Sequence, residues 1–440
     1  MKKRILAALL SSTLVFSALA GCSKDTADSN MVTELSEPIT IEMWHYMNGG
    51  QADALNSIIE DFNATNDKGI TVKGISQGSI VDLNKKVIAA AQSSTLPAIV
   101  NVYPDLATGL IEDGKVTDLS GFINDEKVGM ADEMDDFVDA FIEETSQWGE
   151  NKVYGIPMTK STEVVYVNKN MLEQLGYTLA DLENLTMEKL AEISTKAVTE
   201  LGVAGFGFDS ASNAFISTLK EEGLDFVEAN GTINVDNEWV REYMDFFKPL
   251  YESGAFRVAG DDNFLSNPFV NGKMLAYQGS SAGFAYLNND GAFDIAVVEV
   301  PVFEGKDKAV IQQGASLFVT SDVSAEQQYA AYEFVKFLTN AENTAKFATS
   351  TGYLPVRKSA VETEVVKNVL NDETSLYAAV YNVAQKSLDY AYYTPAINNA
   401  QSARTIAQEK FEAYTKGTIK DVDTLIEDIV SQVQGAIGRN

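Results

Sequence analysis

The segment from residue 39 to residue 103 alternates between strand and helix patterns, and this alternation restricts the possible fold more than any other feature. Apolar and polar residues alternate over 39–43, as in a strand with one buried face. Residues 55–62 carry apolar side chains at helical spacing, 70–75 form a second strand pattern, and Asp82 could cap a helix over 82–92. A near-continuous apolar run over 98–103 is typical of a buried parallel strand. Strand, helix and strand in repeated order predict an α/β fold with a parallel sheet.

The rest of the chain continues in mixed α/β order. The patterns predict two extended runs, at 154–157 and 163–167, followed by a mainly helical segment over 171–248. They also predict two further strands, at 294–300 and 315–320, and a final helix over 422–437. Ser324 followed by Gln327 has the spacing of a capping box at the start of another helix. Because single cores stop growing at about 250–300 residues, a chain of 440 residues is expected to form two lobes.

The formal net charge of the chain is −30 at pH 7. Phosphate contacts need a basic face, so nucleic acid is excluded as a main partner. A membrane-surface role through basic patches is excluded for the same reason. The acidity favours a soluble protein that works outside the cell.

The N-terminus has the layout of a secretion signal followed by the chain's single cysteine. A basic start at residues 2–4 precedes an apolar stretch over 5–19, which is short for a membrane span of about 20 residues. The run Leu19-Ala20-Gly21-Cys22 resembles a bacterial lipobox, which implies cleavage before Cys22 and acylation, palmitate included, of that residue. We therefore predict a signal peptide over 1–21 and a lipidated Cys22 with a flexible tether over 22–37. An ordinary signal peptide with a stray cysteine and a first transmembrane helix are the alternatives.

Motifs for catalysis and metal binding give weaker signals. Gly279 to Gly283 matches the G-x-S-x-G nucleophile elbow, but a serine nucleophile needs a base, and the only histidine, His45, lies far upstream. One histidine and one lipidated cysteine make zinc improbable, and we expect no metal and no cofactor. The acidic cluster over 132–136 fits a solvated helix face better than a calcium loop. A carboxylate pair for glycoside hydrolysis stays open because acidic residues are abundant.

Three of the predicted strands end in aromatic or polar residues. These residues are Trp44, His45 and Tyr46 after the first strand, Gln77 and Ser79 after the second, and Tyr103 and Asp105 after the third. In open α/β sheets, ligands bind beyond the carboxyl ends of the strands. Each aromatic side chain alone could equally be a half-buried core residue. Their convergence at three strand ends favours a ligand site.

At this point the chain resembles the extracellular solute-binding proteins of ABC importers, in the large sugar-binding group known as family 1. The resemblance covers nearly the whole mature chain and rests on six runs, at residues 41–45, 95–100, 153–157, 165–169, 269–274 and 351–356. It implies a two-lobed periplasmic-binding-protein-like fold with hinge-connected lobes and an interlobe ligand cleft. It also implies capture of a solute without catalysis, and delivery to the transmembrane subunits of a permease.

Within this group the chain is most similar to the glycerol-3-phosphate-binding branch. The resemblance implies that the candidate ligand contacts include Ser161, Thr162, Asn213, Ser280 or Ser281, Gly314, Tyr353 and Arg404. The branch's tyrosine before the second helix is replaced, with Ile80 at the matching position, and its acidic residue is Pro104 here. The tryptophans of the branch are missing near 208–215. A neutral sugar and a glycerol-3-phosphate-type solute therefore both stay open as ligands.

The resemblance also implies where the lobes divide. The N-lobe would hold 38–158 and 316–357, and the C-lobe would hold 161–313 and 360–440, with crossings near 158–162, 312–316 and 356–359. The expected product is a lipid-anchored binding protein on the extracytoplasmic face of the cell membrane, with a role in carbohydrate transport. An extracellular carbohydrate-active enzyme is the main alternative, and an adhesin-like lipoprotein is a third.

Overall fold

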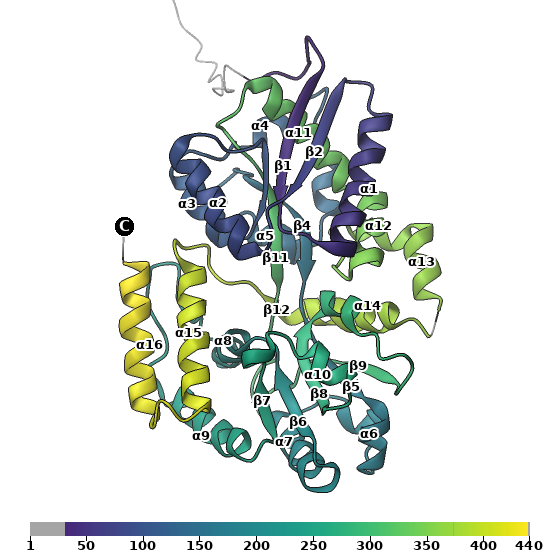
Figure 1. Cartoon of the computed structure of the whole chain (residues 1–440). Coiled ribbons are helices and arrows are strands. Elements are labelled where there is room, and N and C mark those ends of the chain that lie inside the picture. The colour runs from purple at the N-terminus through teal and green to yellow at the C-terminus, as the bar shows by residue number, and fades with distance from the viewer. Residues whose placement is uncertain (1–30, 373, 439–440) are drawn as a thin grey trace, which may run out of the picture.

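Two five-stranded sheets, each covered by helices, form two lobes that lie one above the other in Figure 1. The structure is a computed structural model that describes residues 31–372 and 374–438. The sheet of the N-lobe has the strand order β2-β1-β3-β11-β4, and that of the C-lobe has the order β7-β6-β8-β5-β9. A two-stranded ribbon of β10 and β12 lies between them. The expected two-lobed α/β fold is confirmed.

The N-lobe contains the first part of the chain and a return segment. Its elements are β1 (Ile39–His45), α1 (Gly49–Thr65), β2 (Ile70–Ser76), α2 (Ile80–Ser93), β3 (Ile99–Val102), α3 (Pro104–Glu112), α4 (Ser120–Ile123), η1 (Ala131–Asp136), α5 (Asp139–Glu144), β4 (Gly155–Ser161), β11 (Gln313–Val319), α11 (Ala325–Leu338), α12 (Ala341–Thr351), η6 (Lys358–Glu362) and α13 (Glu364–Leu370).

The C-lobe contains the middle of the chain and its C-terminal helices. Its elements are β5 (Glu163–Asn168), α6 (Lys169–Gln174), η2 (Leu179–Leu182), α7 (Met187–Lys196), η3 (Ala197–Leu201), β6 (Ala204–Phe208), α8 (Ala211–Glu221), α9 (Glu238–Glu252), β7 (Phe256–Val258), η4 (Gly260–Asp262), α10 (Ser266–Val270), β8 (Met274–Ser280), η5 (Ser281–Tyr286), β9 (Ile295–Val298), β10 (Val310–Ile311), α14 (Leu376–Ser387), η7 (Leu388–Tyr390), β12 (Ala391–Tyr392), α15 (Ala400–Thr415) and α16 (Val422–Ile437).

Within the N-lobe sheet, the expectation of parallel pairing is correct only for the first three strands. Strand β1 pairs in parallel with β2 and β3, whereas β11 pairs antiparallel with both β3 and β4. The chain returns from the C-lobe through β11, so this strand enters the N-lobe sheet in the opposite direction. The mainly helical expectation for 171–248 is confirmed, with β6 as an exception whose sequence Ala-Gly-Phe-Gly-Phe has two glycines that weaken the strand signal.

Two helix starts test the capping predictions. Helix α2 is capped by Ser79 rather than Asp82: the Ser79 hydroxyl accepts a hydrogen bond from the Asp82 backbone, and Asp82 reaches back as the reciprocal partner of a capping box. The Asp82 prediction is therefore wrong by three residues. The capping box predicted at Ser324 and Gln327 is confirmed at the start of α11.

The lobes are joined by chain crossings at strand ends. Thr162 separates β4 from β5, and Gln312 separates β10 from β11. Further along, η6 and α13 both contact α12 in the N-lobe, and α14 contacts β9 and η5 of the C-lobe. The lobe boundaries stay a prediction: 360–440 is assigned to the C-lobe from the resemblance, whereas these contacts group α13 with the N-lobe helix α12.

The beginning of the described chain packs against the N-lobe. Met31, Val32 and Leu35 are partly buried against its core, whereas the predicted signal peptide and Cys22 lie outside the described residues. Within residues 31–372 and 374–438, no helix is both long and apolar enough to cross a membrane.

Candidate functional site

Tyrosines gather where the strands of the N-lobe end. Tyr46, which follows β1, donates a hydrogen bond to Thr159 Oγ1 at 3.1 Å, and its hydroxyl lies 3.1 Å from the hydroxyl of Tyr353. Burial raises the pKa of Tyr46, Tyr103 and Tyr353, and each of these hydroxyls interacts electrostatically with another of the three. They are therefore neutral hydrogen-bonding groups on aromatic rings, a combination that suits polar ligands with apolar edges.

A chain of polar side chains faces this cluster from the C-lobe. Arg404 on α15 donates from Nη2 to Asn213 Oδ1 at 2.6 Å, and Asn213 donates to Glu163 Oε1 at 2.7 Å. Gln278 donates to the other oxygen of Glu163, also at 2.7 Å. Burial raises the pKa of Glu163, and the hydrogen bonds from Asn213 and Gln278 oppose this shift. The chain therefore fixes the position of the Arg404 guanidinium.

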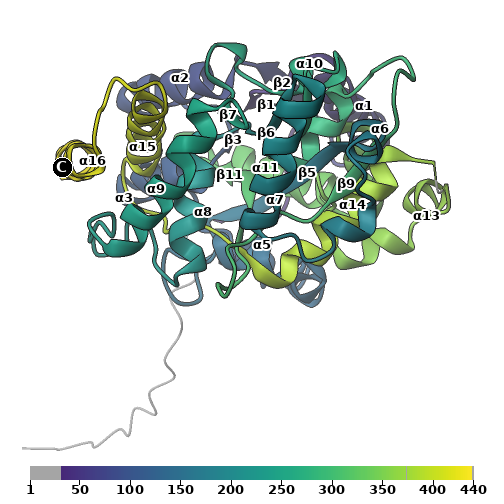
Figure 2. The ribbon, with the colours of Figure 1, turned by 90° about the horizontal axis from the view of Figure 1, so that it is seen from below.

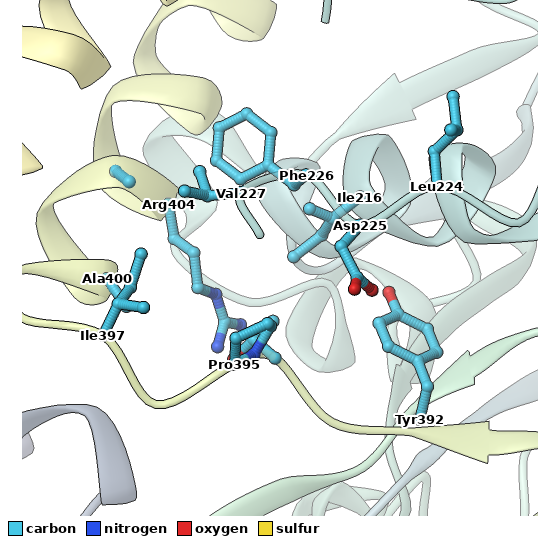
Figure 3. A pocket seen from close by; sticks show the side chains of 12 residues that line it. Ile216, Leu224, Asp225, Phe226, Val227, Tyr392, Pro395, Ile397, Ala400 and Arg404 are labelled. Atoms are coloured by element: carbon cyan, nitrogen blue, oxygen red, sulfur yellow. The ribbon is translucent and has the colours of Figure 1, made fainter. Parts of the chain in front are cut away.

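The two groups meet at Arg404. Its positive charge lowers the pKa of Tyr103 and of Asp105, against the larger upward effect of burial on both. The Nε atom of Arg404 is buried and has no hydrogen-bond partner among the described residues. Figure 3 shows its side chain running from α15 toward Pro395, beside a cavity of about 20 Å³, which is room for about one water molecule. The guanidinium thus has donor capacity that its protein partners do not use.

Four of the predicted residues lie at the two crossings between the lobes. Thr162 donates through Oγ1 to Ile311 O at 3.1 Å, and Ser281 donates its backbone N–H to Thr162 O at 2.8 Å. Ser161 is 4% exposed and pairs with Gln313 at the ends of β4 and β11. Gly314 has φ +117°, and a Cβ at this position would lie 1.7 Å from Thr159 O, so no other residue fits there without movement of the backbone.

Beside these crossings lies a buried ion pair that the sequence did not reveal. The Lys160 side chain is fully buried and donates to the Glu144 carboxylate and, at 3.3 Å, to Gly314 O. Burial raises the pKa of Glu144, and Lys160 opposes that shift. The pair connects α5 with both crossing strands, β4 and β11.

Other predicted residues lie apart from Arg404 and the tyrosines. His45 is 1% exposed, its Nδ1 accepts a hydrogen bond from Met47 N, and burial lowers its pKa to about 4. Trp44 packs half-buried against the N-lobe core, and Ser79 caps α2. The Ser280 hydroxyl accepts a hydrogen bond from Ala282 N at the start of η5. A ligand contact for any of these four remains only a prediction.

Sequence reasoning missed Glu163, Gln278 and Lys160 as members of the site. The sequence held a signal for Glu163, because a carboxylate stands at the head of the apolar run Val164 to Val167; in the structure this residue is 2% exposed. A buried charge requires polar partners, and such a position is a reason to search for them.

The acidic cluster near residue 133 has a structural role. Arg357, which is 2% exposed, donates to Glu133 O at 2.6 Å and contacts the Glu133 carboxylate at 3.3 Å. Ser359 donates to the Asp136 carboxylate. Across the described residues, no three His, Cys, Asp or Glu side chains form a group that could hold a metal ion.

The solved structures that resemble this chain are two-lobed binding proteins. UgpB from Mycobacterium tuberculosis, determined in complex with glycerophosphocholine, has a TM-score of 0.78 and 22% identity, and the match covers 92% of this chain and 99% of that one. The cyclic alpha-maltosyl-1,6-maltose binding protein from Arthrobacter globiformis has a TM-score of 0.75 and 20% identity, with 92% and 100% covered. These likenesses support the fold.

Relatives found by sequence are also solute-binding proteins. The sn-glycerol-3-phosphate-binding periplasmic protein UgpB of Rhizobium meliloti is 23% identical over 412 residues, which are 90% of this chain and 93% of the relative. Residues 57–372, more than half of the chain, match the sequence model of a family described as bacterial extracellular solute-binding protein. The chain therefore belongs to the bacterial extracellular solute-binding protein family.

Proposed function

We propose that this protein is the extracytoplasmic, lipid-anchored binding subunit of an ABC importer, which captures a sugar or a glycerol-3-phosphate-type solute and delivers it to the permease. One observation carries the proposal. Arg404 on the C-lobe lies between Asn213 and the N-lobe residues Tyr103 and Asp105, with a buried Nε that no described residue satisfies. An oxygen of a bound solute would fill that missing contact.

The chemistry of the cluster supports binding without catalysis. Its side chains are hydroxyls, amides, carboxylates and one guanidinium, which orient a ligand through hydrogen bonds. The hydroxyl of Ser281, the serine of the G-x-S-x-G run, belongs to a side chain with 0% exposure at the crossing, and its oxygen lies 3.4 Å from Thr162 N. Relatives named as binding proteins support the same reading.

Calorimetry on the wild type and on Arg404→Ala tests the proposal. The solutes are glycerol-3-phosphate, glycerophosphodiesters and neutral oligosaccharides. If an anionic solute binds through Arg404, the substitution should weaken its binding by at least about 2 kcal/mol, because a desolvated charge loses its partner. Arg241→Ala is the matched control, since Arg241 pairs with Asp236 and Asp423 on another surface.

The outcomes separate the two ligand classes. If neutral oligosaccharides bind and Arg404→Ala leaves their affinity unchanged, the glycerol-3-phosphate type is wrong and a general sugar-binding role replaces it. Recovery of a chemically altered solute after incubation would favour the carbohydrate-active enzyme instead. If the wild type binds no solute of these classes, the proposed ligand range is wrong.

A further inference from the structure

A groove of about 380 Å³ opens between the two lobes, outside the tyrosine cluster. We call it the outer groove. Its walls come from α2, α3 and the start of α15. The residues that line it include Asn84, Ile88, Gly109, Asp113 and Gln401. Figure 1 and Figure 2 both place α15 next to the side of the N-lobe that carries α2 and α3. Its volume lies in the range of about 300–1,000 Å³ that is usual for ligand pockets.

The outer groove adjoins the Arg404 group. Asp105 lines the groove and interacts electrostatically with Arg404. Ala400, one helical turn before Arg404 on α15, lines both the groove and the small cavity beside Arg404. A solute held by Arg404 could therefore extend into the groove past Asp105.

We propose that the outer groove is a second compartment of the binding site, which takes a neutral, hydroxyl-bearing unit such as one sugar ring. This inference rests on the proposed function, because the other end of the same solute would be held by Arg404 and the tyrosines. The transported solute is then a molecule of at least two units, rather than a single hexose or glycerol-3-phosphate alone.

The charges of the lining disfavour ionic groups. The described lining residues include the carboxylates Asp105 and Asp113 and no lysine or arginine, which disfavours a phosphate. The positive end of α15 also faces the groove, which disfavours a cation. Asn399 leaves that end without a side-chain cap, and its side-chain amide donates to Ala436 O at 3.2 Å. A neutral group that both donates and accepts hydrogen bonds suits both features.

The remaining lining residues fit a sugar ring in other ways. The Oδ1 atom of Asn84 is buried and accepts no hydrogen bond from any residue that the structure describes. A ligand hydroxyl could donate to it. Ile88 is 45% exposed on the groove wall, and Leu106 and Leu110 line the opposite helix, so the groove also offers apolar surface for the C–H face of a ring.

The width of the groove is set by close contact between the lobes. A Cβ at Gly109 on α3 would lie 2.9 Å from Asn398 Oδ1, so the glycine lets the segment before α15 approach the N-lobe. Asn398 donates to the Glu112 carboxylate, and Ala396 N donates to Gln147 Oε1 at 2.9 Å. These contacts hold the two walls of the groove at a fixed separation.

The test measures affinity by calorimetry as a function of ligand length. The probes are α-linked glucose oligomers of one to four units, and glycerol-3-phosphate compared with glycerophosphoglycerol and glycerophosphocholine. Ile88→Trp places a larger side chain in the groove, and Asn84→Leu removes the free acceptor. Val81→Trp is the matched control, since Val81 is 56% exposed on the same helix and does not line the groove.

We expect at least one two-unit probe to bind at least ten-fold more tightly than its one-unit counterpart. Both groove variants should remove that gain and leave the one-unit probe and the unfolding midpoint unchanged, and Val81→Trp should change neither. Among the phosphodiesters, glycerophosphoglycerol should gain and glycerophosphocholine should not, because only the first adds a hydroxylated neutral unit.

Three results would overturn the inference while the proposed function stands. In the first, affinity does not increase with ligand length, and in the second, the increase persists in both Ile88→Trp and Asn84→Leu. The third result is an equal loss of affinity for short and long probes in these two variants. A gain for glycerophosphocholine that matches or exceeds that of glycerophosphoglycerol would likewise reject the assignment to a neutral hydroxylated unit. If the wild type binds neither series at all, the proposed function fails and the inference fails with it.

Discussion

Replacement of Lys160 by methionine should strongly destabilise the protein, because it leaves the Glu144 carboxylate buried without its counter-charge. The side chains of Lys160 and Glu144 are 0% and 9% exposed, and Lys160 also donates to Gly314 O at 3.3 Å. Removal of one partner of a buried pair typically costs about 3–5 kcal/mol. This is a large part of a total stability of about 5–15 kcal/mol. Chemical unfolding of the mature protein, followed by circular dichroism, measures the loss.

The loss should depend on pH. Burial raises the pKa of Glu144 and Lys160 lowers it, so the pKa must rise further when Lys160 is absent. A carboxyl whose pKa is raised by folding contributes stability at low pH and loses it as the pH rises through the folded-state pKa. The penalty of Lys160→Met should therefore be larger at pH 8 than at pH 5.

A second substitution separates lost charge pairing from lost packing. Glu144→Gln combined with Lys160→Met removes the unpaired charge, so the double variant should recover most of the stability lost by the single one. A loss below about 1 kcal/mol for Lys160→Met, a loss equal at pH 5 and pH 8, or a double variant no more stable than the single one would refute the reasoning.

Three further substitutions test other parts of the structure. Gly314→Ala should destabilise by about 2 kcal/mol or more in thermal unfolding, because φ is +117° and the new Cβ would lie 1.7 Å from Thr159 O; an unchanged melting temperature would contradict this. Burial raises the pKa of Asp209 to about 7, so its ionisation weakens the fold as the pH rises from about 4 to 7. Asp209→Asn should therefore stabilise the protein by up to about 4 kcal/mol at pH 8, since each pKa unit corresponds to about 1.4 kcal/mol, and by little at pH 4; a pH-independent effect would count against it. Cys22→Ala should release the protein from the membrane fraction and remove the lipid mass, and unchanged fractionation would reject the anchor.

The sequence alone determined the features that depend on residues near one another in the chain. Alternating apolar patterns predicted β1, β2 and β3 and the helices between them, because each pattern repeats within a few residues. The strand-end positions of Tyr46, Tyr103 and Asp105 followed from the same periodicity, since parallel strands end at one edge of a sheet. Tyr353 and Arg404 were named through resemblance to a family, and no local pattern would have singled them out.

The tertiary structure decided what depends on residues far apart in the chain. Asn213 contacts Arg404 across 191 positions, Lys160 contacts Gly314 across 154, and the outer groove joins α2 to α15. Strand β11 lies between β3 and β4 and runs against both, because the chain returns to the N-lobe after building the C-lobe sheet. A hydrophobic period carries information over one helical turn or one strand pair, whereas these contacts depend on how whole elements pack against each other. The burial that shifts the pKa values of Glu163, Glu144 and Asp209 exists only once both lobes are assembled.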